Sequence, residues 1–96
     1  MNVVHHPRVA WEGARAFVNA AGDNAYWWLS DTVGRSLGVT HQTKLSETRL
    51  RLLREDAWLA ETAAWRVRLE DMLHERPDLA PVVLQLVTET SRRLSH

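Results

Sequence analysis

The feature that most constrains the fold is the spacing of apolar residues, which recur every three or four positions along most of the chain. This spacing is typical of amphipathic helices. No segment alternates apolar and polar residues between two turns, so we expect no β-sheet. The sequence therefore predicts an all-α domain. In the first expected helix the apolar residues are Val9, Ala10, Ala14, Phe17, Val18 and Ala21.

Length, charge and cysteine content limit the possible classes of protein. A chain of 96 residues forms one domain. Twelve basic and twelve acidic side chains give a formal net charge of zero, which argues against a nucleic acid or an anionic membrane as the partner. Cysteine is absent, which excludes disulfides and sulfur-ligated zinc. Because no apolar run reaches the roughly 20 residues of a membrane span, we expect a cytoplasmic protein.

Glycine marks the expected helix ends in the first half of the chain. After a leader over residues 1–7, residues 8–37 form either two helices or one. Gly22 divides them in the first case, and in the second it lies inside a helix at a cost of about 1 kcal/mol relative to alanine. Gly38 is typical of the residue that follows a helix. We expect residues 38–44 to form a polar connection.

A long central helix is predicted over residues 46–75, because neither glycine nor proline interrupts this segment. Ser46 is its expected N-cap. Pro77 ends it, and Asp78 is the expected N-cap of a last helix over residues 78–94. The expected architecture is a three- to four-helix bundle around the long helix.

The predicted long helix carries two apolar stripes about 130° apart around its axis. A helix with two such stripes needs two packing partners, and we expect the other helices to cover one stripe and a partner chain the other. The first stripe consists of Leu50, Leu53, Ala57, Ala60, Ala64 and Val67. The second consists of Trp58, Trp65, Leu69 and Met72.

The predicted interaction surface is rich in tryptophan. The chain has five tryptophans, a core of this size holds two or three, and tryptophan is enriched where proteins bind each other. The same side chains can instead form the core of a monomer, and the sequence leaves both interpretations open. The candidate interaction residues are Trp58, Trp65, Leu69 and Met72, with Trp27 and Trp28 as a second patch.

No pattern indicates catalysis or a cofactor. The sequence contains neither a Gly-x-Ser-x-Gly elbow nor a glycine-rich phosphate loop. Asp71 and His74 can share a helix face, but metal-binding helical bundles need further Glu and His ligands on other helices. We expect no enzyme activity, no catalytic residue, no cofactor and no metal site.

A degenerate helix-turn-helix over residues 31–54 is the alternative hypothesis, and it predicts a small DNA-binding regulator. Gly38 and Val39 would form the turn, and the basic residues of the second helix would meet phosphates. Against it, Lys44 and Glu47 occupy positions that should be apolar. The basic residues concerned are Lys44, Arg49, Arg51 and Arg54.

A pattern of generic helical positions covers most of the chain. Its residues are Trp28-Leu29 after an Ala/Gly-rich start, then Trp65, Leu69 and Leu73, then Pro77-Asp78-Leu79, then Val83 and Leu86-Val87. In this pattern the chain resembles small helical modules of actinobacterial proteins that accompany effector domains of predicted conflict or signalling systems. The resemblance implies an adaptor-like role in a bacterial cell, in which helix packing recruits a protein partner or forms a homo-oligomer.

Overall fold

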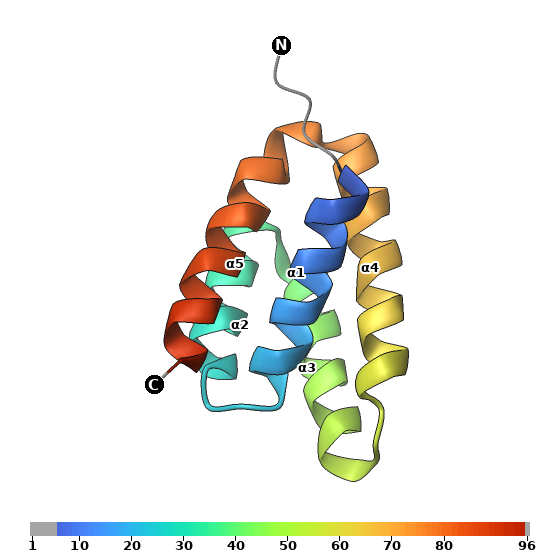
Figure 1. Ribbon diagram of the computed structural model, residues 1–96, viewed down its shortest axis with the longest axis vertical. Coiled ribbons are helices and arrows are strands. Elements are labelled where there is room, and N and C mark those ends of the chain that lie inside the picture. The colour runs from blue at the N-terminus through green and yellow to red at the C-terminus, as the bar shows by residue number, and fades with distance from the viewer. Residues whose placement is uncertain (1–5, 96) are drawn as a thin grey trace.

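The computed structural model describes residues 6–95, and this part of the chain is all-helical, as predicted (Figure 1). Within residues 6–95, five α-helices replace the three or four expected. The expected leader lies outside the described residues up to residue 5, while His6 and Pro7 already belong to the first helix. The helices are α1 (His6–Ala21), α2 (Tyr26–Ser36), α3 (Val39–Arg54), α4 (Trp58–Glu75) and α5 (Ala80–Leu94), and a 3-10 turn, η1 (Pro77–Leu79), joins the last two.

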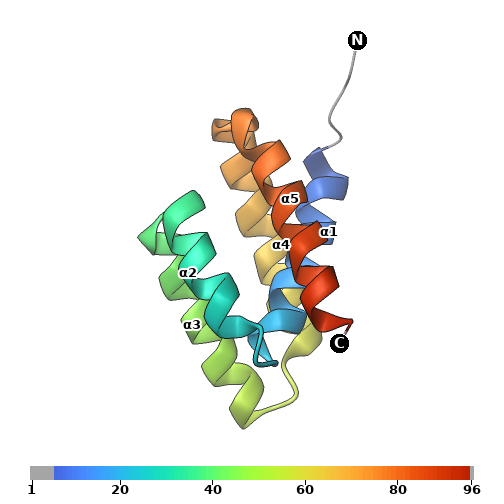
Figure 2. The same ribbon diagram turned by 90° about the vertical axis from the view of Figure 1, so that its left-hand side faces the viewer.

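The helices form two layers. Helices α1, α4 and α5 make one layer, and α2 and α3 pair as the second (Figure 2). Successive helices run in alternating directions along the long axis, which measures 44 Å (Figure 1). Helix α1 packs against each of the other four, so it occupies the central position that we expected for the segment 46–75.

Small residues allow α1 to take this position. Many of its buried residues are alanine or glycine, so neighbouring backbones approach closely. At Gly13 an added Cβ would lie 2.8 Å from Leu69 of α4 and 2.9 Å from Val83 of α5. Helix α1 is therefore central because its side chains are small. The length of an uninterrupted helical segment does not predict which helix is central.

Both glycine signals in the first half mark real helix ends. Helix α1 ends at Ala21, and the carboxylate of Asp23 accepts the N–H of Ala25 in the turn that follows, so residues 8–37 form two helices. Gly38 has φ +105°, and its N–H donates to the carbonyl of Val33 over 3.1 Å, as in a helix C-terminus closed by glycine. The prediction of a polar connection over residues 38–44 is wrong, because a helix begins at Val39.

Helix α3 begins directly after Gly38, because the carbonyl of this residue accepts the first helical hydrogen bond, from the N–H of Gln42. Ser46 therefore lies inside α3 and is not an N-cap.

The single helix predicted over residues 46–75 is not present. Helix α3 ends at Arg54, Glu55 is extended (φ −155°, ψ 167°), and α4 begins at Trp58. The chain reverses here without glycine or proline because the reversal places two helices, instead of one, against α1. Burial of apolar surface from both segments outweighs the local preference for a continuous helix.

Pro77 follows the end of α4, as predicted, but Asp78 does not cap the next helix. Its carboxylate accepts two hydrogen bonds from the guanidinium of Arg76, at 3.0 and 2.8 Å. Since proline starts the 3-10 turn, α5 begins later, at Ala80.

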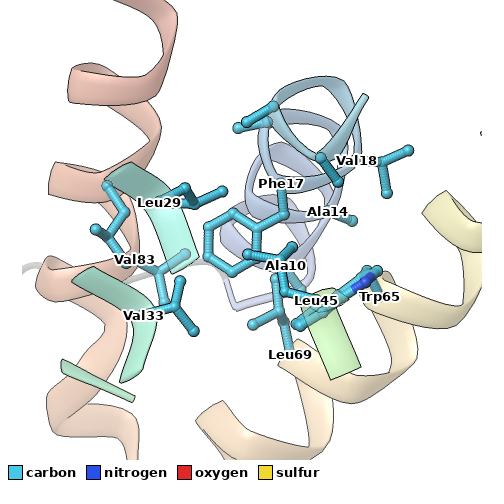
Figure 3. Close-up of a cluster of buried hydrophobic side chains, with 14 of the residues drawn as sticks. Ala10, Ala14, Phe17, Val18, Leu29, Val33, Leu45, Trp65, Leu69 and Val83 are labelled. Atoms are coloured by element: carbon cyan, nitrogen blue, oxygen red, sulfur yellow. The ribbon is translucent and has the colours of Figure 1, made fainter. Parts of the chain in front are cut away.

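The core lies between the two layers and around α1 (Figure 3). Phe17 of α1 meets Trp65 of α4 edge to face, with ring centroids 5.4 Å apart. Leu45 contributes to the same core from α3, and Leu29 and Val33 contribute from α2. Each helix thus places at least one fully buried side chain in a single cluster.

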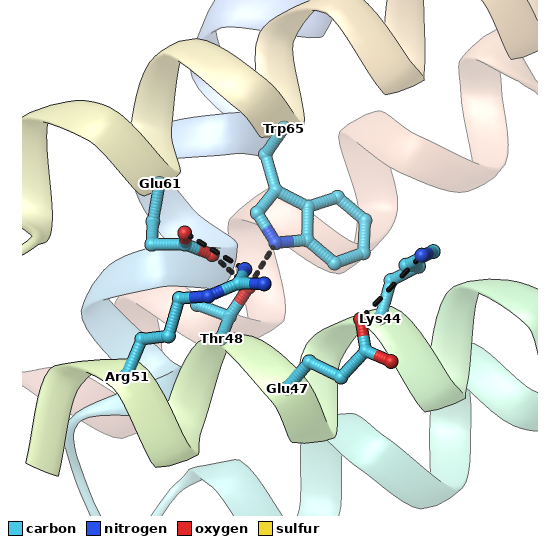
Figure 4. A network of polar contacts seen from close by, with 6 residues as sticks. All are labelled: Lys44, Glu47, Thr48, Arg51, Glu61 and Trp65. Carbon is cyan, nitrogen blue, oxygen red and sulfur yellow. Dashed lines mark hydrogen bonds and ion pairs between the residues drawn. The ribbon is translucent and has the colours of Figure 1, made fainter.

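A buried polar network joins α3 to α4 (Figure 4). The indole N–H of Trp65 donates to the hydroxyl of Thr48 over 2.8 Å, and that hydroxyl donates to the carboxylate of Glu61 over 2.6 Å. The half-exposed Arg51 completes the chain by pairing with Glu61 at 3.1 Å. Every member has a partner, so the network fixes the register of the two helices at little cost.

Candidate interaction surface

The predicted tryptophan stripe on α4 is part of the core. Trp65 and Leu69 have no exposed surface, and both lie against α1 and its neighbours (Figure 3). They are unavailable to a partner chain, so the interaction surface predicted on these two residues is wrong. The chain itself covers the stripe because α4 packs on α1 through it.

Trp58, Met72 and Trp28 are half-buried and pack at the edge of the same core. The indole N–H of Trp58 donates to the side-chain oxygen of Asn19 over 2.7 Å. The guanidinium of Arg93 lies 4.1 Å from the ring centroid of Trp28. These three residues complete the fold and offer only part of their surface to a partner.

Trp27 is the one predicted residue that remains largely exposed, at 67%. It lies on the outer side of α2, at the end where α2 begins. Arg49 of α3 holds it in place, since the guanidinium lies 5.4 Å from the Trp27 ring centroid and donates to the carbonyls of Ala21 and Asp23. The indole thus has a cation beside one part of its ring and presents most of its surface to solvent.

Three large apolar residues of α3 lie exposed in the same layer. Val39, Leu50 and Leu53 are exposed by 69%, 57% and 65%. By helical periodicity they lie on the side of α3 that faces away from the buried Leu45 and Thr48. Leu53 follows Arg49 by one turn, which places it beside the residue that holds Trp27. We name Trp27, Val39, Leu50 and Leu53 together the α2–α3 face.

The sequence contained part of this signal. Leu50 and Leu53 belong to the first apolar stripe, which we expected to pack against the other helices. The break at residues 55–57 divides that stripe, so Ala57 is buried while Leu50 and Leu53 face solvent. Val39 lies in the segment that the sequence predicts as a polar connection. The other exposed large apolar side chains are Trp11 on α1, Leu59 and Val67 on α4 and Leu84 on α5.

The basic residues of the helix-turn-helix hypothesis mostly have partners within the chain. The short connection after α2 does lead directly into α3, but three of the four side chains are engaged, which leaves Arg54 as the one without a partner among the described residues. The engaged groups are Lys44 with Glu47 at 3.5 Å, Arg49 with the carbonyls of Ala21 and Asp23, and Arg51 with Glu61.

Between residues 6 and 95 no three His, Asp or Glu side chains gather closely enough to hold a metal ion. Within the same range, no helix combines the length and the apolar character needed to cross a bilayer.

Comparison with known proteins gives no match for this chain among family models, curated proteins or solved structures. The resemblance to actinobacterial helical modules therefore stays a prediction.

Proposed function

We propose that this chain is a non-catalytic helical interaction module that associates with a second copy of itself through the α2–α3 face. The observation that carries the proposal is the exposure, by 57–69%, of four large apolar side chains on one layer of a domain whose core is closed. Leu50 and Leu53 lie about one turn apart near Arg49, which contacts Trp27, while Val39 lies at the other end of α3. Grouped apolar side chains on a surface are typical of sites where proteins bind each other. The adaptor-like role that the sequence resemblance implies is of the same class.

Charge favours a second copy as the partner. The chain has a formal net charge of zero, so two copies do not repel each other. Near the face, Asp31 pairs with Arg35 at 2.9 Å and Lys44 with Glu47 at 3.5 Å, while Arg54, next to Leu53, has no partner among the described residues. An apolar patch whose surrounding charges are mostly balanced can face a copy of itself, as a twofold interface requires.

The size of the face sets the expected strength. Apolar burial contributes about 25 cal/mol per Å², and stable interfaces bury roughly 800 Å² on each partner. Four side chains supply only a part of such an area. We therefore expect a weak, concentration-dependent dimer, with a dissociation constant on the order of micromolar or weaker.

The test is sedimentation velocity over a range of protein concentrations. We expect the weight-average sedimentation coefficient of the wild type to rise with concentration, and Leu53→Glu to sediment as a monomer, because a buried carboxylate has no partner in the interface. Leu84→Glu is the matched control, since Leu84 is exposed by 43% on α5, outside the face. Circular dichroism checks that each variant is folded.

Two outcomes would overturn the proposal: a wild type that stays monomeric at millimolar concentration, or a Leu84→Glu variant that dissociates as readily as Leu53→Glu. Binding of labelled duplex DNA that weakens steeply with added salt would instead support the helix-turn-helix hypothesis.

A further inference from the structure

A second feature is a cavity of about 290 Å³ between the start of α3 and the second half of α4. The two helices run in opposite directions (Figure 1), and side chains from the first turns of α3 and the second half of α4 line the cavity together. The residues that line it are mostly charged or polar, with Met72 as the apolar one, but most of the surface that they present to the cavity comes from apolar atoms. The lining residues are Thr40, His41 and Lys44 from the α3 side and Arg68, Asp71, Met72, Glu75 and Arg76 from the α4 side.

Arg68 is the unusual member of this lining. Its Nη1 atom is buried and has no hydrogen-bond partner, and among the described residues its guanidinium forms no ion pair. The group lies 4.9 Å from the ring centroid of Trp65, so its main contact is the face of an indole. The side chain is partly exposed, but its buried Nη1 has no hydrogen-bond acceptor, although Asp71 lines the same cavity. An anionic ligand would supply that acceptor.

The other arginines near Arg68 differ from it. Arg66, two residues earlier on α4, pairs with Glu70 at 2.7 Å, and Arg76 pairs with Asp78 at 2.8 Å. Three cations, Lys44, Arg68 and Arg76, therefore line the cavity, and Arg68 is the one of them that forms no ion pair among the described residues.

The α3 side adds further groups that favour an anion. Helix α3 has no side-chain cap at Gly38, so the N–H groups of its first turn are free, and the positive end of the helix dipole lies there. Thr40 and His41 belong to this turn and line the cavity. Lys44 forms only a loose ion pair, at 3.5 Å, and about half of its side chain is exposed, so it can turn toward a ligand.

We propose that this cavity binds a small organic anion, whose carboxylate or phosphate group pairs with Arg68 and whose apolar part contacts Met72. Arg68 supplies the planar, two-pronged donor that both oxyanions accept. Asp71 and Glu75 also line the cavity and lower its net positive charge. Their carboxylates repel extended polyanions, so the ligand is a small molecule with one anionic group.

The test is a titration of the full chain followed by NMR, with inorganic phosphate and butyrate as separate probes and chloride as the ionic-strength baseline. We expect the Arg68 Nε–H and Trp65 indole N–H signals to shift with saturation for at least one probe. The probe that saturates distinguishes a phosphate from a carboxylate ligand. A saturable shift with butyrate but none with phosphate would support a contact between Met72 and the apolar part of the ligand.

Arg68→Gln is expected to weaken binding at least tenfold, because the substitution removes the charge and keeps most of the volume. Arg66→Gln is the matched control and is expected to bind as the wild type does, since Arg66 already pairs with Glu70 and does not line the cavity. Arg68→Lys keeps the charge without the planar fork, and we expect intermediate affinity.

The proposal fails if neither probe gives a saturable shift, or if Arg68→Gln binds as tightly as the wild type. Loss of binding in Arg66→Gln to the same extent would also contradict it, since the effect would then follow from general charge. None of these outcomes depends on self-association through the α2–α3 face.

Discussion

The five tryptophans differ in burial: one is fully buried, two are half-buried and two are exposed. Trp65 is fully buried and its N–H donates to Thr48, whereas Trp58 is half-buried and its N–H donates to Asn19. Trp28 is also half-buried, while Trp11 and Trp27 are exposed by 41% and 67%. The count of tryptophans predicted that some lie outside the core. It could not predict which ones, because the polar partners come from helices distant in the sequence.

Thr90 is expected to lower the stability of the folded chain. It has no exposed surface, and its hydroxyl has no hydrogen-bond partner. An unsatisfied buried hydroxyl costs about 1–3 kcal/mol. Thr90→Val keeps the shape and removes this group, so we expect the free energy of unfolding in urea to rise by about 1 kcal/mol.

Thr62→Val is the matched control for this change. Thr62 is equally buried, but its hydroxyl donates to the carbonyl of Trp58 over 2.7 Å. The same substitution there removes a satisfied group, and we expect no gain. Equal effects of the two substitutions would show that the missing partner of Thr90 is not what matters.

At the scale of the helices, the sequence predicted those helix ends that depend on the backbone properties of a single glycine or proline. Gly38 reverses the chain with φ +105°, and Pro77 stops α4. The break at residues 55–57 could not be predicted, because Glu55, Asp56 and Ala57 carry no such signal. Tertiary packing against α1 determines that break. As a result, Leu50 and Leu53, which the sequence placed in a packing stripe, lie at the surface.

Packing between helices is tightest at Gly13, and this position predicts a clear effect on stability. A Cβ there would lie 2.8 Å from Leu69 and 2.9 Å from Val83, two fully buried side chains on different helices. Alanine favours the helix by about 1 kcal/mol over glycine, but overpacking a core costs about 1–3 kcal/mol. We expect Gly13→Ala to lower the free energy of unfolding by about 1 kcal/mol in chemical denaturation.

Gly22→Ala provides the comparison, because the nearest atoms to an added Cβ there lie 3.8 and 3.9 Å away. Its effect is expected to stay within about 0.5 kcal/mol. A Gly13→Ala variant as stable as the wild type would mean that α4 and α5 move apart at no cost, which contradicts a close-packed α1.

At the scale of the whole molecule, the two candidate sites both use α3 and come closest at its start, where Val39 of the face precedes Thr40 of the cavity. The α2–α3 face lies on the outer side of one layer, and the cavity at Arg68 lies where the start of α3 meets the second half of α4. The sequence predicted association, but of the residues it named only Trp27 is largely exposed, while Trp65 and Leu69 are buried in the core. The sequence could not predict the cavity. That Arg68 lacks a hydrogen-bond partner can be recognised only when the positions of α3 and α4 are known.

The stability of the whole domain is expected to depend on pH through His41. Burial, opposed by a hydrogen bond to the backbone of Leu37, lowers the pKa of His41 below its ordinary value of 6.5, and the charge of Arg68 lowers it further. The unfolded chain therefore binds this proton more readily than the folded chain. The contribution of neutral His41 is complete above pH 6.5 and is lost as the pH falls from that value toward the pKa of the folded state.

His41→Gln cannot take up the proton, so its free energy of unfolding in urea should decline less than that of the wild type between pH 7.5 and pH 5. Parallel pH profiles for the two proteins would show that His41 accepts a proton as easily in the fold as in the unfolded chain, and the cation beside it would then be less buried than the unpartnered Nη1 of Arg68 indicates.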